Sequence, residues 1–381
     1  MGNAPQRAIQ CRACRGSFGE IVLDLGDQPA CDFFPTVDAP GPDPVYPLMM
    51  GLCTTCGLAQ LLEDPTVPEE PRGVEPLALV DQAADAVSRV ADAGLLPAGA
   101  TVAEYGSPHG GSWLGLLTRR DLVPVPGMAT ADLIIDCFGL MHAADQAGAL
   151  AERAARVAPG GTLLLQYHSL DTIVRDAQWN ALRHGHYAYY STTALQAMLD
   201  AVGFSPRTAW RFDLYGGTVL LAARRDADGA GAWDNTGHAD DAVSALLAAE
   251  DKSGVRDPRS LGRLQDDAWA HARALHGWLA GAREAGQIVI GYGAASRAVA
   301  LLCMAGVDRD LLSAVADAAP AKQGRRMPGT SIPVISPDEL VSRRPDVVLV
   351  MVSDLMAEIQ DAYPQVTAAG GRWVDAARLP D

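Results

Sequence analysis

The sequence predicts an α/β protein of three domains: an N-terminal zinc-binding domain, a reduced Rossmann core and a C-terminal Rossmann-like domain. Two cysteine pairs lie near the start of the chain, and a strand followed by a glycine-rich turn and a helix occurs twice, at residues 101–114 and 287–298. At 381 residues the chain exceeds one ordinary domain. We therefore expect domains over residues 1–75, 76–235 and 236–381.

Composition narrows the classes of partner. The chain has 30 basic and 46 acidic residues, a formal charge of −16, and no visible basic patch. Such a charge repels nucleic acid and anionic membranes. The apolar runs are too short to cross a bilayer, and the polar start lacks the apolar core of a signal peptide. We expect a cytoplasmic protein that binds neither, and the oligomeric state stays open.

Four cysteines have the spacing of a metal site. They form two C-x-x-C pairs, Cys11 with Cys14 and Cys53 with Cys56. Each pair presents two thiolates to one ion, and four thiolates with no open position are typical of structural zinc. A redox dithiol is the alternative, but no βαβ pattern surrounds either pair. We predict a zinc ion that stabilises the fold and takes no part in the chemistry.

The first strand–turn–helix unit predicts a cofactor site. A linker rich in proline and acid spans residues 65–76, a helix is expected from Asp81 to Ala93, and a strand at residues 101–105 then enters a glycine turn. Glycines let the backbone approach a ligand, and a helix N-terminus offers free N–H groups. The expected cofactor residues here are Glu104, Gly106, Ser107 and Gly110. A plain strand-to-helix turn is the alternative.

The remainder of the core follows the order strand, helix, strand and closing hairpin. The expected segments are a strand at Asp132–Phe138, a helix at Ala144–Val157, a Pro159-Gly160-Gly161 turn into a strand, and hairpin strands at Ala209–Leu214 and Thr218–Arg224. This order is similar to the second half of an S-adenosylmethionine methyltransferase fold, so the predicted core is methyltransferase-like.

Two histidines and three tyrosines gather in residues 183–191, after the last strand of that half. Open α/β sheets bind ligands at the carboxyl ends of their strands. An imidazole or a phenol there can act as a general acid or base, and we expect His186, Tyr189 and His184 to be catalytic. The alternative is that the tyrosines only pack and the histidines lie on the surface.

The second unit predicts a phosphate site. An apolar strand enters the turn Gly291-Tyr292-Gly293, and Ser296 and Arg297 open the next helix. Glycine-exposed N–H groups and an arginine suit a diphosphate. Residues 322–326, which begin with Lys322 and include two arginines, add a positive edge or are merely a solvated loop.

Taken together, these motifs resemble the C-methyltransferases of nucleotide-activated deoxysugars from antibiotic pathways. The resemblance implies a four-cysteine zinc domain, a methyltransferase core, and a C-terminal domain whose G-Y-G-A turn helps hold the nucleotide sugar. The matching positions are Cys11, Cys14, Cys53, Cys56 and Gly57; Tyr46-Pro47-Leu48; Glu104, Gly106, Ser107 and Gly110; Pro159-Gly160-Gly161; Gly291 to Ala294; Lys322-Gln323-Gly324; and Pro328-Gly329-Thr330.

The chain also departs from this family. The family's Tyr-His-Glu-His run reads Arg183-His184-Gly185-His186 here. Between Leu117 and Asp132, where the family has a strand, a helix and a strand, some fourteen residues remain, and the acidic residue that grips the cofactor ribose is missing. The usual site for S-adenosylmethionine is therefore altered.

These departures suggest a changed reaction. Arginine accommodates a 2′-phosphate in NADP sites, and Arg119 and Arg120 follow the first core helix, so we expect NADPH at the core. Some relatives look like 4-ketoreductases, and the main prediction is reduction at C4 of a dTDP-4-keto-deoxyhexose with NADPH. The alternatives are C-methylation of such a sugar with S-adenosylmethionine, or a non-catalytic partner that binds the nucleotide sugar.

Overall fold

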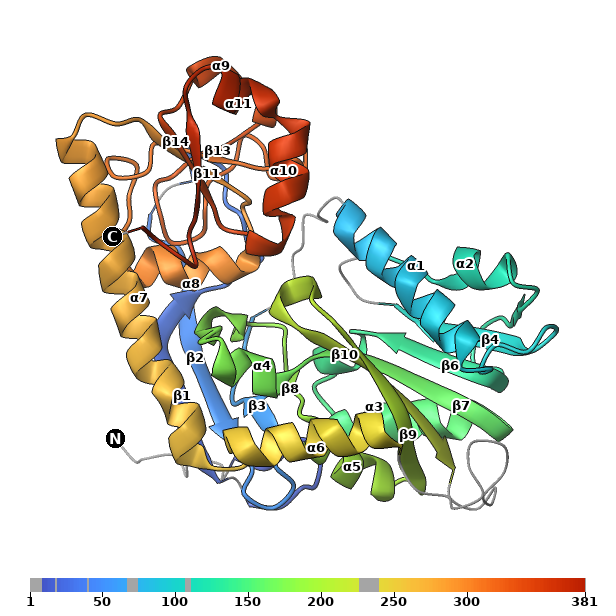
Figure 1. The fold of residues 1–381 in the computed structure, drawn as a ribbon. Helices are drawn as coiled ribbons and strands as arrows, with labels where there is room; N and C mark the ends of the chain where they lie inside the picture. The colour runs from blue at the N-terminus through green and yellow to red at the C-terminus, as the bar shows by residue number, and fades with distance from the viewer. Residues whose placement is uncertain are drawn as a thin grey trace.

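The computed structural model describes residues 9–17, 19–39, 41–66, 75–106, 111–225 and 240–380. Its strands form three sheets (Figure 1). Apart from one strand of the first sheet, these sheets come from the N-terminal, central and C-terminal parts of the chain in that order. No helix in these described ranges is long and apolar enough to cross a membrane.

The N-terminal sheet has the order β1-β2-β3-β8. Its first three strands are β1 (Glu20–Pro29), β2 (Val45–Leu52) and β3 (Ala59–Leu61), all antiparallel. The fourth strand, β8 (Ala188–Tyr189), comes from the histidine-rich stretch more than a hundred residues later and pairs antiparallel with β3. A segment of the core thus completes the sheet of the zinc-binding domain.

The core sheet has the order β5-β4-β6-β7-β10-β9. Its parallel half comprises β4 (Thr101–Tyr105), β5 (Val123–Pro124), β6 (Ala131–Cys137) and β7 (Val157–His168). An antiparallel hairpin, β9 (Phe204–Phe212) and β10 (Thr218–Arg225), closes it. The Pro159-Gly160-Gly161 turn lies inside β7, where Gly160 has a φ of +73°. The shortened segment after Leu117 leaves only the two-residue β5 at this edge of the sheet.

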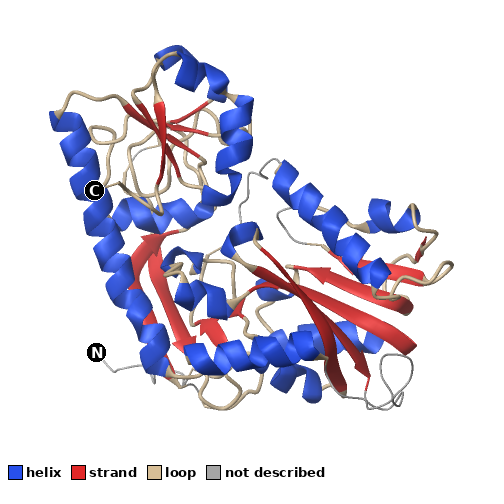
Figure 2. Cartoon of the chain, viewed as in Figure 1, coloured by secondary structure: helices blue, strands red, loops and turns tan. Residues whose placement is uncertain are grey.

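Helices cover both faces of the core sheet (Figure 2). One face packs against α1 (Leu77–Asp92) and α2 (Leu114–Thr118), and the other against α3 (Gln146–Arg156), α5 (Thr192–Asp200) and α6 (Asp241–Ser253). Alternate residues of the same strand enter opposite cores: Ile134 packs with α3 and α5, while Leu133 and Ile135 pack with α1. The helix expected from Asp81 begins four residues earlier, at Leu77.

The C-terminal domain is a parallel sheet of order β13-β12-β11-β14-β15, buried between helices. Its strands are β11 (Val289–Tyr292), β12 (Val315–Ala316), β13 (Val334–Ile335), β14 (Val347–Val350) and β15 (Arg372–Asp375). Its helices are α8 (Ser296–Met304), α9 (Pro337–Arg343), α10 (Met356–Ala362) and α11 (Pro364–Ala368). Strands β11 and β14 are uninterrupted apolar runs, as expected for strands covered on both faces.

The long helix α7 (Pro258–Glu284) runs along both the N-terminal sheet and the C-terminal domain (Figure 1). Asp257 caps its N-terminus by accepting from the N–H of Arg259, and the helix has proline in its first turn. Its buried residues, among them Leu264, Leu275 and Leu279, belong to the same core as Leu23 of β1 and Leu349 of β14. The first and third layers therefore share one apolar core.

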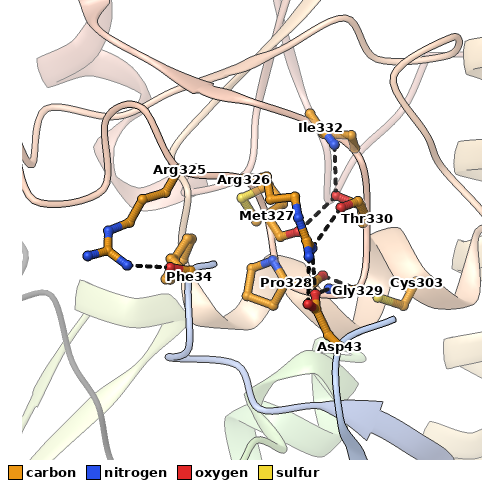
Figure 3. A network of polar contacts seen from close by, with 10 residues as sticks. All are labelled: Phe34, Asp43, Cys303, Arg325, Arg326, Met327, Pro328, Gly329, Thr330 and Ile332. Carbon is orange, nitrogen blue, oxygen red and sulfur yellow. Dashed lines mark hydrogen bonds and ion pairs between the residues drawn. The ribbon is translucent and has the colours of Figure 1, made fainter. Parts of the chain in front are cut away.

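A buried ion pair also joins these two layers (Figure 3). Arg326 binds Asp43 through both guanidinium ends, at 2.6 and 2.7 Å, and the N–H of Gly329 donates to Asp43 at 2.7 Å. Arg325 donates to the carbonyl oxygen of Phe34 at 2.6 Å. The prediction that residues 322–326 form a positive edge for a diphosphate is wrong for these two arginines, because both bind the N-terminal domain.

We predict that replacing Asp43 by alanine destabilises the protein by about 3–5 kcal/mol, because Arg326 is then left charged and buried without its partner. The side chains of Asp43 and Arg326 are only 6% and 10% exposed. The measurement is the free energy of unfolding in denaturant. Asp85 forms an exposed pair with Arg89, and we expect Asp85→Ala to cost less than about 0.5 kcal/mol. Equal losses in the two variants would contradict the assigned role of Asp43.

Candidate functional site

The four predicted zinc ligands converge. The Sγ atoms of Cys11 and Cys56 are 3.5 Å apart and those of Cys14 and Cys53 are 3.6 Å apart, and all four lie within 4.8 Å of one another. Sulfur atoms at about 2.3 Å from one tetrahedral zinc have such separations. The Cys56 thiol beside it lowers the pKa of Cys11 to about 5, which favours the thiolate that a metal binds. The cluster is an N-terminal zinc site of four cysteines.

The zinc site is linked to the histidine-rich stretch through β3. Cys53 and Cys56 lie in the turn between β2 and β3, and the N–H of Cys53 donates to the carbonyl of Leu58 at 2.9 Å. Beyond this turn, Ala59 of β3 pairs with Tyr189 of β8. The metal thus fixes the turn, the turn fixes β3, and β3 fixes the strand that follows His186.

A cavity of about 250 Å³ lies where the N-terminal domain, the core and the C-terminal domain meet. The N-terminal domain contributes Asp32 and Phe34 to its wall, and the C-terminal domain contributes Ser296, Arg297 and Lys322. The core contributes three imidazoles and an arginine, namely His142, His168, His186 and Arg183. Of the expected catalytic residues, His186 and Tyr189 line this cavity.

Arg183 is held in the cavity wall by both of these residues. Its Nε–H donates to Nε2 of His186 at 2.9 Å, and its backbone N–H donates to the Tyr189 hydroxyl at 3.1 Å. The lone pair on Nε2 of His186 is therefore occupied by a guanidinium. In this arrangement His186 orients Arg183. A proton on Nε2 of His186 would face the positive charge of the Arg183 guanidinium.

Gly185 allows the turn that brings these groups together. Its φ is +80°, a conformation that costs glycine little. Its N–H donates to Asp64 at 2.6 Å, and its carbonyl lies 2.9 Å from Nδ1 of His142. The residue that replaces a carboxylate of the resembled family thus anchors the stretch to both the N-terminal domain and the core.

His184 points away from the cavity. Its Nε2 lies 3.3 Å from the carbonyl oxygen of Pro47, and its ring packs edge-on against Tyr46 at 6.1 Å. Burial lowers its pKa and favours the neutral ring. These contacts hold the stretch against β2.

Sequence reasoning missed His142 and His168. His142 follows β6 in the short helix η1 (Leu140–His142), and His168 is the last residue of β7. The signal was available, because each histidine follows or ends a parallel core strand at its carboxyl end. A carbonyl acceptor beside Nδ1 of His142 places the hydrogen on Nδ1 and the lone pair on Nε2.

The expected cofactor turn is only partly described, because Ser107 and Gly110 lie outside the described residues. Glu104 accepts from the Ser112 hydroxyl and from the Trp113 N–H, both at 2.6 Å. Its carboxylate therefore closes the turn onto α2. Gly106 ends the described part of the turn after β4.

A polar position without a partner lies at this end of the cavity. Nε2 of Gln166 donates to Oε1 of Gln82 at 2.8 Å. The other amide atoms, Oε1 of Gln166 and Nε2 of Gln82, are buried and have no hydrogen bond in the described ranges. Gln166 lines the cavity beside Leu79 and Trp113. An apolar slot with an unused buried acceptor fits a ligand that carries both apolar and hydrogen-donating groups.

The glycine turn of the C-terminal domain uses most of its own donors. The N–H of Gly293 donates to Ala316 and that of Ala294 donates to Asp317, both at 2.8 Å. Gly291 and Tyr292 are buried in β11, and the Tyr292 ring packs on Tyr363 at 5.7 Å, away from the cavity. A phosphate at this turn would meet the start of α8 instead.

Arg297 lies at that helix start and lines the cavity. Its guanidinium carbon is 5.9 Å from the Tyr215 ring, and burial followed by the charge of Arg183 lowers its pKa. Lys322 is already engaged, because its Nζ donates to the carbonyl of Ala294 at 2.8 Å. The two arginines make this part of the cavity strongly attractive to an anion.

Three family models match successive parts of the chain. The first is described as a putative zinc binding domain and matches residues 11–70. The second is a methyltransferase domain over residues 72–209, and the third is a C-methyltransferase C-terminal domain over residues 213–377.

The chain is 26% identical over 242 residues to C-methyltransferase NovU from Streptomyces niveus. The alignment covers 62% of this chain and 54% of NovU, so the chain spans about half the length of that relative.

Among solved structures, magnesium protoporphyrin IX methyltransferase from Synechocystis PCC 6803 aligns at 12% identity and a TM-score of 0.30, over 39% of this chain and 84% of that one. A putative methyltransferase from Bacillus halodurans C-125 aligns at 12% identity and a TM-score of 0.29, over 36% and 98%.

The main prediction from the sequence, reduction of a 4-keto-sugar with NADPH, is wrong. Two matched models describe methyltransferase domains and the curated relative is a C-methyltransferase. The arginines that suggested NADPH do not support it either, because Arg119 and Arg120 are exposed at the end of α2 and do not line the cavity. Their charges face solvent.

We predict about one zinc per chain, measured by metal analysis of the purified protein. Cys56→Ser removes one of four thiolates, so this variant should lose the metal and unfold at a lower concentration of denaturant than wild type. The matched control is Cys303→Ser, because Cys303 lies outside the cluster and contacts the carbonyl of Pro328 at 3.6 Å. Wild-type protein that folds without zinc would contradict the assignment.

We also predict that His142 makes the fold sensitive to acid. Burial, followed by the charge of Arg183, lowers its pKa from 6.5 to about 4. The unfolded chain then binds more protons between these values, so this contribution to stability is full above pH 6.5 and is lost as the pH falls. From about pH 7.5 to about pH 5, wild type should lose roughly 2 kcal/mol more unfolding free energy than His142→Phe.

The control for this pH series is His276→Gln on α7, where the histidine is exposed. Its stability should follow the wild-type dependence on pH. A His142→Phe variant that also follows the wild-type dependence would show that His142 is not held in its neutral form.

Residues from one end of the chain to the other contribute to this arrangement. The four cysteines form a closed metal site, the core is a methyltransferase-type Rossmann sheet, and the C-terminal sheet is parallel throughout. The three matched models follow in the same order as these three parts. The chain belongs to the C-methyltransferase family, with zinc-binding, methyltransferase and C-terminal domains.

Proposed function

We propose that the protein transfers a methyl group from S-adenosylmethionine to a carbon atom beside the carbonyl of a nucleotide-activated sugar. The match to a methyltransferase domain and the similarity to NovU support the reaction type. The observation that carries the proposal is the cavity between the core and the C-terminal domain, which holds Arg183, Arg297 and three imidazoles. The resemblance to deoxysugar C-methyltransferases supports the sugar class.

The end of the cavity near Gln166 suits S-adenosylmethionine. Leu79, Trp113 and Phe138 supply apolar surface there, and the unused Oε1 of Gln166 can accept from an amine or a hydroxyl. The bound donor supplies an electrophilic methyl group. No carboxylate of α2 or β5 is required in this interpretation, because Gln166 provides the buried acceptor.

The opposite end suits the diphosphate of a nucleotide sugar. Arg297 and Ser296 lie in the first turn of α8, where the helix dipole and unpaired N–H groups favour an anion. Within the described ranges the Arg297 guanidinium forms no hydrogen bond and interacts with Asp354 only through its charge, so its N–H groups can bind phosphate oxygens.

The chemistry between the two ends requires a proton acceptor and stabilisation of an enolate. The carbon–hydrogen bond beside the sugar carbonyl breaks, and the proton passes to Nε2 of His142. Burial and the charge of Arg183 lower the pKa of this imidazole, so the step depends on strong stabilisation of the enolate. The electron pair is delocalised onto the carbonyl oxygen, where the positive charge of Arg183 stabilises it, and the carbon becomes the nucleophile that methylation requires. His186 and Tyr189 keep Arg183 in place for this task.

We predict that wild type, given S-adenosylmethionine labelled in its methyl group and a dTDP-4-keto-6-deoxyhexose, produces a sugar that carries the label on carbon. Arg183→Met should lower kcat about 10²- to 10³-fold, because one preorganised charge at the developing enolate is lost. The label is located by NMR of the product. Exchange of the α-hydrogen with deuterated water, measured without the methyl donor, reports proton removal separately.

His276→Gln serves as the control because His276 lies outside the cavity, where its Nδ1 is 2.8 Å from the carbonyl of Ala305, and it should keep full activity. Wild type that exchanges no α-hydrogen and methylates no nucleotide sugar would overturn the proposed function. Full activity in Arg183→Met would overturn the role of Arg183 alone.

A further inference from the structure

A second neutral imidazole lines the cavity, and the proposed function does not use it. His168 ends β7, pairs across the ladder with Thr218 of β10, and reaches the cavity between the core and the C-terminal domain. We infer that Nδ1 of His168 accepts a hydrogen bond from a hydroxyl group of the nucleotide-activated sugar, and that Gln178 positions the imidazole for this role. This inference rests on the proposed function.

Gln178 fixes which nitrogen of His168 carries the hydrogen. Its Nε2 donates to the carbonyl of Gly216 at 3.0 Å, and its Oε1 lies 2.9 Å from Nε2 of His168. The reverse orientation of the amide would place two oxygens against each other, so Oε1 must accept and Nε2 of His168 must donate. The lone pair of the imidazole is therefore on Nδ1.

The amide itself cannot move freely. Gly216 has a φ of +74°, and a Cβ atom at this position would lie 2.3 Å from Nε2 of Gln178. The backbone of the β9–β10 turn thus packs directly on the amide. On the other side, Gln178 precedes the short helix η2 (Trp179–Ala181), and its N–H donates to Ile173 at 2.9 Å. The acceptor on His168 is preorganised from two directions.

The charges around His168 keep it neutral. Burial and the positive charges of Arg297 and Arg183 lower its pKa to about 3. Gln178 adds no charge, and within the described part of the chain no hydrogen bond other than that to Gln178 is formed by its ring. The ring is therefore neutral at neutral pH, and its second nitrogen remains a good hydrogen-bond acceptor.

This acceptor complements the donors around it. Arg183 and Arg297 offer only N–H groups, which suit phosphate and carbonyl oxygens of a nucleotide keto-sugar. The hydroxyl groups of the same ligand need acceptors, and His168 supplies one without adding the negative charge of a carboxylate. A sugar that lacks this hydroxyl would leave Nδ1 without a partner, and the site should discriminate against it.

The test is calorimetric titration of the full-length zinc-loaded protein with dTDP, dTDP-glucose and S-adenosylhomocysteine. His168→Phe should weaken binding of dTDP-glucose about 10- to 100-fold and leave the affinities for dTDP and S-adenosylhomocysteine unchanged. A selective loss for S-adenosylhomocysteine would mean that His168 binds the ribose of the methyl donor, and would overturn the inference.

Gln178→Leu provides a second variant that keeps the imidazole, and His168→Asn one that keeps an acceptor. Nitrogen-15 NMR of the His168 ring should show one tautomer, with hydrogen on Nε2, in wild type and a mixture of tautomers in Gln178→Leu. Gln178→Leu should also lose less affinity for dTDP-glucose than His168→Phe does. His168→Asn should recover part of the loss seen in His168→Phe. A wild-type ring with hydrogen on Nδ1 would overturn the inference.

The outcomes separate this inference from the function on which it rests. Equal weakening of dTDP and dTDP-glucose in His168→Phe would overturn the role of His168 and leave the proposed function intact. Wild type that binds neither dTDP nor dTDP-glucose would overturn both. His276→Gln is the control for substitution of a histidine outside the cavity.

Discussion

The antiparallel pairing of β3 with β8 is the contact on which the candidate site depends. Ala59 of β3 follows the second cysteine pair, and Tyr189 of β8 follows the turn that holds Arg183 and His186. The two segments are distant in the sequence, and four thiolates on one metal hold the turn that leads into β3. The zinc site thus acts on the cavity through backbone geometry, without contributing a group to it.

The C-terminal domain is fixed against this frame by two different interactions. Helix α7 contributes apolar side chains to a core shared with β1 and β14, which favours close contact but specifies little about orientation. The bidentate pair of Asp43 with Arg326 adds a directional contact. Together they hold Arg297 beside Arg183, two like charges that repel each other in the protein alone. Binding of an anion relieves that repulsion, which is why this arrangement suits a diphosphate.

Much of the fold followed from local patterns in the sequence. The cysteine spacing identified the metal site, and the glycine turns after β4 and β11 identified both Rossmann-type sheets, because these signals lie within a few consecutive residues. Contacts between segments that are distant in the sequence could not be predicted from local patterns. Arg325 and Arg326 looked like a phosphate-binding edge until Phe34 and Asp43 proved to be their partners. His142 and His168 are single residues in their segments, and only the convergence of strand ends brings them into the cavity. Gly185, in place of the family's glutamate, was one of the departures that suggested a changed reaction, although its positive φ is what lets Asp64 and His142 hold the turn.

The central claim is that one cavity binds the methyl donor at the core and the nucleotide at the C-terminal domain, with Arg183 between them. A crystal structure of the zinc-loaded protein with S-adenosylhomocysteine and dTDP tests it most directly. We predict electron density for S-adenosylhomocysteine beside Gln166 and Phe138, and for the diphosphate of dTDP at Arg297 and the start of α8. Either ligand bound outside this cavity, or both ligands on the same side of Arg183, would contradict the account.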